Sequence, residues 1–352
     1  MTIKNYYYYA NQFYQFSNAL PLYNKIGGTF IANNRFSKKF KFAKYLRNLN
    51  TSQNHKSLFN IPPIKFKNIK NELNIKGIIF SQSNRELHTN NNCTKIFIGH
   101  GTGDKRYEEK AYNLETYDYH FVVGHKQIQK YKDDKANIPE EKIIKIGNMR
   151  FDDYINNKID KEKIINNYGI KNRNLKTILY APTWRFGAGT FKTHVKKFIK
   201  EISPKFNLIV RPHFHNAHHI PKIKFWAKIN GYKNVYFSNP GNLYKNDTMF
   251  DFAISDLMIS DTSSILYEYL ITNKPMIVVK NEFDDYHKMP DEMNIMTAVD
   301  VYDGQMNICK LIDENIKTQK YSDEYKKMLH SCFYFNDGKS TERAIKFIKS
   351  IE

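Results

Sequence analysis

The chain has 352 residues, of which 41% are apolar and 15% aromatic, so it is too long for one ordinary core and too apolar for a disordered protein. Its 55 Lys and Arg outnumber 35 Asp and Glu, and the net charge of +20 invites a polyanion: nucleic acid, an anionic membrane surface or a phosphate-rich substrate. No apolar run approaches the ~20 residues that span a bilayer, and no apolar signal core follows the first residues, so neither a membrane-spanning protein nor a secreted one is expected.

Short apolar strands alternate with helical patterns along the whole chain. In the first half we expect helices at residues 12–25 and 37–48, and strands at residues 6–9, 29–32, 77–80, 95–98, 120–123 and 143–146. In the second half we expect strands at residues 177–180, 208–210, 235–237, 257–259 and 276–279. Repeated β-then-α units with fully apolar strands predict parallel sheets that helices cover on both faces.

Two such sets of strands predict two doubly wound, Rossmann-like α/β domains joined by a polar hinge at residues 166–174. We place an N-terminal domain, facing an acceptor and a membrane, at residues 1–165, and a C-terminal, ligand-binding domain at residues 166–335. Residues 336–352 form a C-terminal helix that can cross back to the N-terminal domain. Because ligands gather at the carboxyl ends of parallel strands, we expect the active site in a cleft between two facing domains.

Positive charge is concentrated near the N-terminus, where residues 1–80 hold thirteen Lys and Arg and one acidic residue. Residues 35–47 combine apolar side chains at helical spacing with a basic remainder, which is typical of a helix that lies on an anionic membrane. The alternative is a domain helix that solvates its lysines. We expect a combination of the two: a helix that belongs to the domain and whose basic side contacts lipid head groups or a polyanionic acceptor. The basic residues are Lys38, Lys39, Lys41 and Lys44.

The first polar cluster follows the strand at residues 95–98. Gly99, Gly101 and Gly103 let the backbone approach a ligand closely and leave His100 in a tight, exposed turn. A neutral imidazole there can take a proton from an attacking hydroxyl. The residues alone allow equally a glycine-rich turn in which His100 only forms a hydrogen bond.

Two further clusters also follow strands. Thr183 and Arg185 can hold an anion, although a plain corner with a packed tryptophan is the better explanation of this segment taken alone. Arg211 and His213 suit a phosphate, and His213 can donate a hydrogen bond to a phosphoryl oxygen in the transition state. A metal site built on the histidines after His213 is less expected, because no carboxylate or cysteine accompanies them at ligand spacing.

The strongest cluster follows the strand at residues 257–259. Thr262, Ser263 and Ser264 offer hydroxyls and backbone N–H groups at the start of an amphipathic helix, which suits a diphosphate. Glu268 lies one turn further on the same face, where its carboxylate can accept both hydroxyls of a ribose. Ordinary helix capping explains the same residues and is compatible with binding.

At these residues the sequence resembles the CDP-glycerol:poly(glycerophosphate) glycerophosphotransferases, the family of teichoic-acid polymerases and primases. The resemblance covers about residues 95–345 and rests on the order of His100–Thr102, Tyr180–Arg185, Arg211–His213, Ile259–Ser264, Glu268–Leu270 and Asn273–Pro275. Gly147–Asp152 and Asp337–Ser340 look like two further family segments, with Met149 in place of a proline. The family often reads His-Gly-Thr-Pro-Leu-Lys, whereas here Gly103 and Asp104 precede Lys105.

The resemblance implies a GT-B-type architecture and an enzyme that moves glycerol phosphate, or another polyol phosphate, from a CDP-activated donor to an acceptor hydroxyl, releasing CMP. It makes His100 the base and His213 the residue that acts on the phosphate. With the clusters above, we expect the diphosphate on Thr183, Arg185, Arg211, Thr262, Ser263 and Ser264, the ribose on Glu268, and an acceptor loop of Gly101, Thr102 and Lys105.

The expected acceptor is a cell-surface glycan or a teichoic or capsular polymer, including a lipid-linked one, and the expected location is cytoplasmic, on the inner face of the cytoplasmic membrane. No cofactor and no metal site are predicted, and dependence on Mg²⁺ is left open. The alternative is a GT-B glycosyltransferase with a nucleotide-sugar donor in capsule or lipopolysaccharide synthesis. It stays open because Thr262, Ser263, Ser264 and Glu268 are expected to contact only a diphosphate and a ribose, which both kinds of donor contain. A second class of function is that of a non-enzymatic basic binding protein for nucleic acid or membrane. The sequence has no recognisable nucleic-acid-binding module, so nucleic acid is not expected as a partner.

Overall fold

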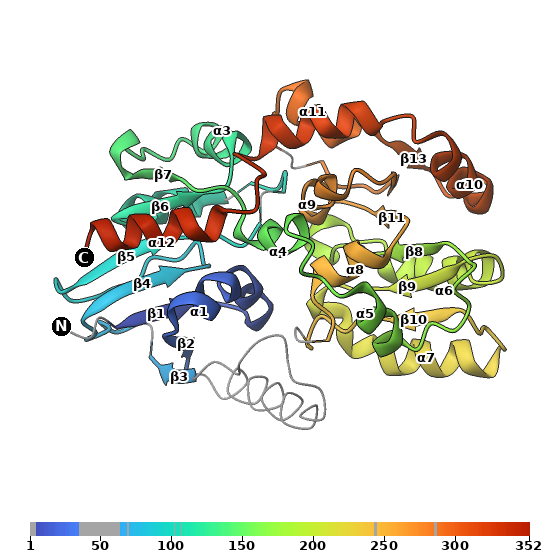
Figure 1. Ribbon diagram of the computed structural model, residues 1–352, viewed down its shortest axis with the longest axis horizontal. Helices are drawn as coiled ribbons and strands as arrows, with labels where there is room; N and C mark the ends of the chain where they lie inside the picture. The colour runs from blue at the N-terminus through green and yellow to red at the C-terminus, as the bar shows by residue number, and fades with distance from the viewer. Residues whose placement is uncertain are drawn as a thin grey trace. The chain divides into compact units, whose positions relative to one another are not determined.

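Figure 1 shows the computed structural model, which describes residues 5–34, 64–68, 70–101, 103–106, 108–242, 245–284 and 287–352. The helix expected at residues 37–48, with Lys38, Lys39, Lys41 and Lys44, lies outside these residues, as does Thr102. The chain forms two compact units. The first comprises Met1–Gly101, Arg106–Asn156 and Phe333–Glu352, and the second comprises Thr102–Lys105 and Asn157–Cys332. The domain limits expected at residues 165 and 335 stay predictions.

The first unit is built on a parallel sheet of seven strands in the order β3-β2-β1-β4-β5-β6-β7. The strands are β1 (Tyr6–Tyr9), β2 (Thr29–Asn33), β3 (Ile64–Lys67), β4 (Gly77–Ser81), β5 (Cys93–Phe97), β6 (Tyr119–Val122) and β7 (Ile143–Lys145). The strand order reverses between β1 and β4, so the point at which ligands of such sheets bind lies at the carboxyl ends of these two strands.

Side chains on both faces of this sheet are buried, as a parallel sheet requires. On one face Tyr8 stacks between Phe30 and Phe80, with ring centroids 4.9 and 5.3 Å away, and Phe347 of α12 (Ser340–Ser350) covers Phe121. Figure 1 shows α12, in red, lying across this face near α1 (Leu20–Ile26). The last helix of the chain therefore belongs to the unit that the first strand begins.

The other helical segments among the described residues of the first unit are short. They are η1 (Phe13–Asn18), η2 (Glu108–Thr116), α3 (His125–Asp133), η3 (Glu140–Lys142), η4 (Met149–Phe151) and α4 (Asp152–Ile155). The helical segment expected at residues 12–25 is present in two parts, the 3₁₀ helix η1 and the α-helix α1. Pro21 lies in the first turn of α1, where its missing N–H costs nothing, and it disfavours continuation of a helix from before it.

The second unit carries a parallel sheet of six strands in the order β10-β9-β8-β11-β12-β13, which reverses between β8 and β11. The strands are β8 (Thr177–Tyr180), β9 (Asn207–Val210), β10 (Val235–Phe237), β11 (Leu257–Ser260), β12 (Met276–Val279) and β13 (Asp300–Tyr302). Two reversing parallel sheets confirm the prediction of two doubly wound α/β units.

Helices cover the second sheet as well. They are α5 (Lys161–Tyr168), η5 (Arg185–Gly187), α6 (Phe191–Ile202), η6 (Phe214–His219), α7 (Ile220–Ile229), α8 (Thr248–Ile254), α9 (Ile265–Tyr269), η7 (Leu270–Thr272), η8 (Asp291–Met293), η9 (Ile295–Ala298), α10 (Ile308–Thr318) and α11 (Ser322–Cys332). Helices α6, α7 and α10 share one hydrophobic cluster with the strands. The expected hinge at residues 166–174 is wrong in its first part, since α5 continues to Tyr168 and ends at Gly169 in the left-handed conformation. Among the described residues, no helix is long and apolar enough to cross a membrane.

Candidate active site

A buried carboxylate, that of Asp261, organises the carboxyl edge of the second sheet. Asp261 follows β11 and accepts hydrogen bonds from the backbone N–H of Thr183 (2.7 Å), the N–H of Thr190 (2.8 Å) and the hydroxyl of Thr190 (2.9 Å). Burial raises the pKa of Asp261, while these three donors and the nearby Lys105 ammonium oppose the rise. Asp261 thus fastens the loop after β8 to the end of β11. No role was predicted for Asp261 from the sequence.

The hydroxyl residues after Asp261 lie at the same edge. The Thr262 hydroxyl accepts a hydrogen bond from the Asn281 side chain (2.8 Å), which also donates to the carbonyl of Gly187 (3.1 Å). Thr262 is therefore held between the ends of β11 and β12. Ser264 precedes α9, which has five residues before η7 follows. The helix expected after the hydroxyl residues is present but short, so hydroxyls and local N–H groups, rather than a long helix dipole, must attract an anion here.

Glycine, aspartate and lysine at positions 103–105 pack against this edge, within the second unit. A Cβ atom on Gly103 would lie 2.8 Å from Cβ of Ser264, so only glycine fits. The Asp104 carboxylate accepts a hydrogen bond from the Tyr267 hydroxyl (2.7 Å), and the Asp104 carbonyl accepts one from the N–H of His287 (2.8 Å). Gly103 and Asp104, the two residues that depart from the family pattern, therefore contact the start of α9 and a side chain of α9.

Lys105 joins the same group. Its ammonium donates to the Thr183 hydroxyl (2.8 Å). Burial lowers the pKa of Lys105 to about 8, and the Asp261 carboxylate limits the fall. The prediction placed Lys105 in an acceptor loop, but the structure brings it together with Thr183, one of the residues expected to bind the donor diphosphate.

Arg211 lies beneath this edge in a buried ion pair. Its Nη1 donates to Asp251 Oδ2 (2.8 Å), the Ser238 hydroxyl (2.7 Å) and the carbonyl of Asn246 (2.6 Å). Asp251 is fully buried and also accepts from the hydroxyl of Tyr168. These partners favour a positioning role for Arg211, and diphosphate binding by Arg211 stays a prediction. The sequence gives no signal for Asp251, which lies in the apolar helix α8.

His213 follows β9 with a defined tautomer. Its Nδ1 accepts a hydrogen bond from the N–H of His215 (3.3 Å), which places the proton of the neutral ring on Nε2. The ring stacks on Trp184, with centroids 5.6 Å apart and planes at 9°. Burial, followed by the charges of His215, Lys105 and Arg211, lowers the pKa of His213 to about 3. His213 is thus a neutral hydrogen-bond donor at Nε2.

Two other predicted donor residues differ sharply in exposure. Arg185 begins η5 and is exposed, with its guanidinium 5.0 Å from the ring centroid of Phe186. Glu268 in α9 is 4% exposed. Arg185 is therefore accessible to an anion, whereas a ribose that contacts Glu268 must reach a largely buried carboxylate.

His100 lies in the first unit, after β5. Its Nδ1 lies 2.5 Å from the carbonyl oxygen of Gln82, the residue after β4. A carbonyl only accepts, so Nδ1 carries the proton and Nε2 of the neutral ring carries the lone pair. Gly99 and Gly101 flank the ring with φ of +63° and +140°, values that favour glycine. Burial lowers the pKa of His100 to about 4, so the ring is neutral at pH 7.

The structure therefore brings together, in the second unit, most of the residues expected on the donor side. His100 and Gly101 belong to the first unit, where they follow β5 and where His100 contacts Gln82 at the carboxyl end of β4. Within the described parts of the chain, no group of three or more His, Cys, Asp or Glu side chains is placed to hold a metal ion.

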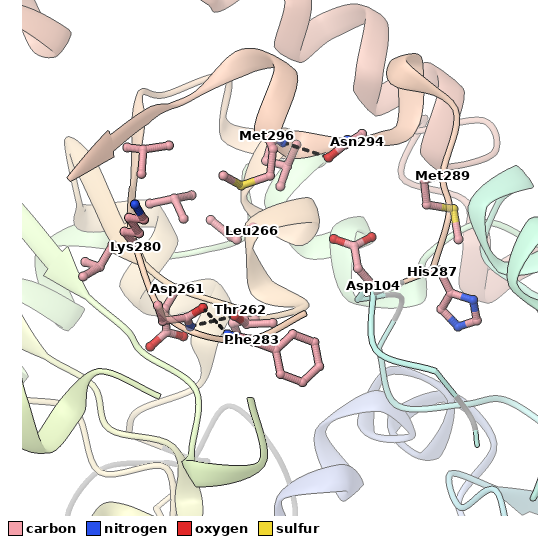
Figure 2. Close-up of a pocket in the computed structure, with 16 residues that line it drawn as sticks. Asp104, Asp261, Thr262, Leu266, Lys280, Phe283, His287, Met289, Asn294 and Met296 are labelled. Atoms are coloured by element: carbon pink, nitrogen blue, oxygen red, sulfur yellow. Dashed lines mark hydrogen bonds between the residues drawn. The ribbon is translucent and has the colours of Figure 1, made fainter. Parts of the chain in front are cut away.

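Figure 2 shows a pocket of about 340 Å³ beside the Thr262–Ser264 segment, formed wholly by the second unit. Asp104 and His287 lie on one side of it in the view, and Lys280 lies on the other, beyond Leu266. Its remaining lining residues are Asp261, Thr262, Ser263, Val278, Val279, Asn281, Phe283, Met289, Asn294, Ile295, Met296 and Val301. The pocket thus continues from the predicted diphosphate site.

Two curated relatives are similar to this chain. A teichoic acid glycerol-phosphate primase of Bacillus subtilis is 25% identical over 260 residues, which cover 71% of this chain and 61% of that protein. The teichoic acid ribitol-phosphate polymerase TarK of Staphylococcus aureus is 28% identical over 251 residues, which cover 66% and 45%. The chain therefore spans less than two thirds of the length of either relative.

A solved structure and a family model complete the comparison. The wall teichoic acid polymerase TagF shares the fold, with a TM-score of 0.69 and 18% identity over 99% of this chain and 88% of that one. This likeness confirms the predicted GT-B-like class of two doubly wound units; that they face each other across a cleft stays a prediction. The sequence model of the CDP-glycerol:poly(glycerophosphate) glycerophosphotransferases matches residues 78–350. The chain belongs to the CDP-glycerol:poly(glycerophosphate) glycerophosphotransferase family.

Proposed function

We propose that the chain transfers glycerol phosphate, or another polyol phosphate, from a CDP-activated donor to a hydroxyl of a teichoic or related cell-surface polymer and releases CMP. Membership of the family supports the reaction class. The observation that carries the proposal is that Nδ1 of His100 faces a carbonyl oxygen, whereas Nδ1 of His213 faces an N–H group, which implies opposite tautomers of the two neutral rings. Nε2 of His100 is an acceptor, whereas Nε2–H of His213 is a donor.

His100 acts on the acceptor. The acceptor hydroxyl gives its proton to Nε2 of His100 as its oxygen attacks the phosphorus that carries the polyol. The bond from this phosphorus to the CMP oxygen breaks, and CMP leaves with the electron pair. A lowered pKa keeps His100 in the form that accepts a proton, and the anionic donor favours the imidazolium that results.

The second unit binds the donor and stabilises its charge. Nε2–H of His213 donates to a phosphoryl oxygen, while the Lys105 ammonium and the exposed Arg185 supply positive charge. Hydroxyls of Thr183, Thr262, Ser263 and Ser264 hold the diphosphate, and Glu268 holds the ribose. Positioning and electrostatics dominate such phosphoryl transfers, so no covalent intermediate with the protein is required.

The acceptor side includes a membrane in this proposal. We infer that the acceptor can be lipid-linked and that the chain lies on the inner face of the cytoplasmic membrane, because basic residues crowd its N-terminal region. Changing Lys38, Lys39, Lys41 and Lys44 together to glutamate should weaken binding to vesicles that contain anionic lipid. Unchanged vesicle binding would refute this part.

The donor test is an incubation with CDP-glycerol, CDP-ribitol and a UDP-sugar, each with a teichoic acceptor, followed by measurement of released nucleotide. The proposal expects CMP from at least one CDP-polyol and no UDP. Release of UDP with sugar transfer would instead support the glycosyltransferase alternative, and release of neither nucleotide would refute the proposed chemistry.

A further inference from the structure

The pocket of Figure 2 is too small for a whole nucleotide donor and is placed to hold one end of it. Its volume of about 340 Å³ lies at the lower limit of small-molecule sites, which run from roughly 300 to 1,000 Å³. Thr262 and Ser263 line it, whereas Glu268, the predicted ribose ligand, is not among its lining residues. With a diphosphate on Thr262 and Ser263, the group that enters the pocket is therefore the one on the side away from the ribose.

We propose that this pocket binds the polyol of the donor and that Asp104 determines polyol specificity by accepting hydrogen bonds from its hydroxyls. This inference rests on the proposed function and assigns a place to the group that is transferred.

The Asp104 carboxylate is fixed for this role. The Tyr267 hydroxyl holds its Oδ2, the N–H of His287 holds its carbonyl, and the close contact of Gly103 with Ser264 holds the residue before it. Figure 2 shows the carboxylate directed toward the middle of the pocket. A carboxylate oxygen accepts more than one hydrogen bond, and bonds from hydroxyls to an ionised acceptor are about twice as strong as neutral ones.

The remaining walls suit a polyol and oppose a phosphate. Leu266, Val278, Val279 and Ile295 offer apolar surface to a carbon chain and keep water out. A phosphate in the pocket would meet two carboxylates, Asp104 and Asp261, against one ammonium group, that of Lys280, so the lining repels a further anion on balance. The charge pattern therefore leaves the phosphates outside and admits the uncharged polyol.

The test compares binding of CDP-glycerol and CDP by calorimetry in the full chain, because the two ligands differ in the polyol. Asp104→Asn keeps an oxygen for Tyr267 but removes the charge. We expect CDP-glycerol to bind about tenfold more weakly to this variant, with CDP affected less than about twofold. The matched control is Asp313→Asn, on the exposed side of α10.

A second variant tests the pocket without altering Asp104. Met296 lines the rim and is 46% exposed, so Met296→Trp should fold while narrowing the pocket. It should weaken CDP-ribitol, with its longer polyol, more than CDP-glycerol, and leave CDP unchanged. An equal loss of CDP and CDP-glycerol in Asp104→Asn, or unchanged CDP-glycerol binding in both variants, would overturn the inference. Failure of the proposed function is distinct, since the unaltered chain would then release no CMP.

Discussion

The buried pair of Arg211 and Asp251 yields the sharpest prediction about stability. Their charged atoms lie 2.8 Å apart, and the two side chains are 9% and 0% exposed. Removing one partner of a buried pair leaves an uncompensated charge and costs about 3–5 kcal/mol. Arg211→Met should therefore lower the free energy of unfolding of the second unit by that amount. This is a large part of the roughly 5–15 kcal/mol that stabilises a typical domain.

A double variant separates charge from packing. Arg211→Met with Asp251→Asn removes both charges. The Asn amide keeps one acceptor oxygen, and its NH₂ group can donate to the hydroxyl oxygen of Ser238 or Tyr168, so about half or more of the lost stability should return. Urea unfolding followed by tryptophan fluorescence reports on the second unit, because Trp184 and Trp226, the two tryptophans of the chain, both belong to it.

The same variants decide what Arg211 does. If it only positions the turn that carries His213, the double variant should bind CDP within about threefold of the unaltered chain. If it is a diphosphate ligand, CDP binding should stay weak although stability returns. A single Arg211→Met variant that loses less than about 1 kcal/mol would refute the reasoning about the buried pair.

Three further predictions concern the edge of the second sheet. Gly103→Ala should weaken donor binding about tenfold, because the Cβ of the alanine would lie 2.8 Å from Cβ of Ser264. The KM for the donor measures this effect, and an unchanged KM would contradict the prediction. Because burial lowers the pKa of Lys105 to about 8, the protonated fraction of Lys105 falls between pH 7 and pH 9. Donor KM should therefore rise over this range in the unaltered chain but not in Lys105→Arg, whose charge persists, and parallel profiles would argue against Lys105. Asp261→Asn turns an NH₂ group toward a backbone donor of Thr183 or Thr190, so loop cleavage by protease should accelerate, and an unchanged rate would contradict this role.

Burial explains which strands could be predicted from the sequence. The central strands are mostly apolar because helices cover both faces of the sheets, and all of the expected strands are present. Among the described residues, β3 and β13 are the strands that were not predicted, and both lie at sheet edges. In β3 exposed residues alternate with half-buried ones, including Lys65 and Lys67, and β13 has only three residues with Val301 37% exposed.

The part of the candidate site that could be predicted from the sequence consists of motifs that directly follow strands. The topology of a parallel sheet brings the carboxyl ends of its strands to one edge, so such motifs are expected to lie together. Partner choice could not be predicted. Arginine after a strand suits a phosphate or a buried carboxylate equally, and only the tertiary structure pairs Arg211 with Asp251. Likewise Asp104 and Tyr267 are 163 positions apart in the sequence, so no local pattern joins them.

The most direct test of the central claim measures CMP release from CDP-glycerol, with a teichoic acceptor, by the unaltered chain and by His100→Ala. If His100 is the base, His100→Ala should lower kcat by about 10²–10⁴-fold, because a general base contributes that much. The dissociation constant of CDP-glycerol should stay unchanged, since the donor residues belong to the second unit. The control is His88→Ala, an exposed histidine of the first unit, which should keep full activity. Release of CMP by His100→Ala at the rate of the unaltered chain would contradict the account.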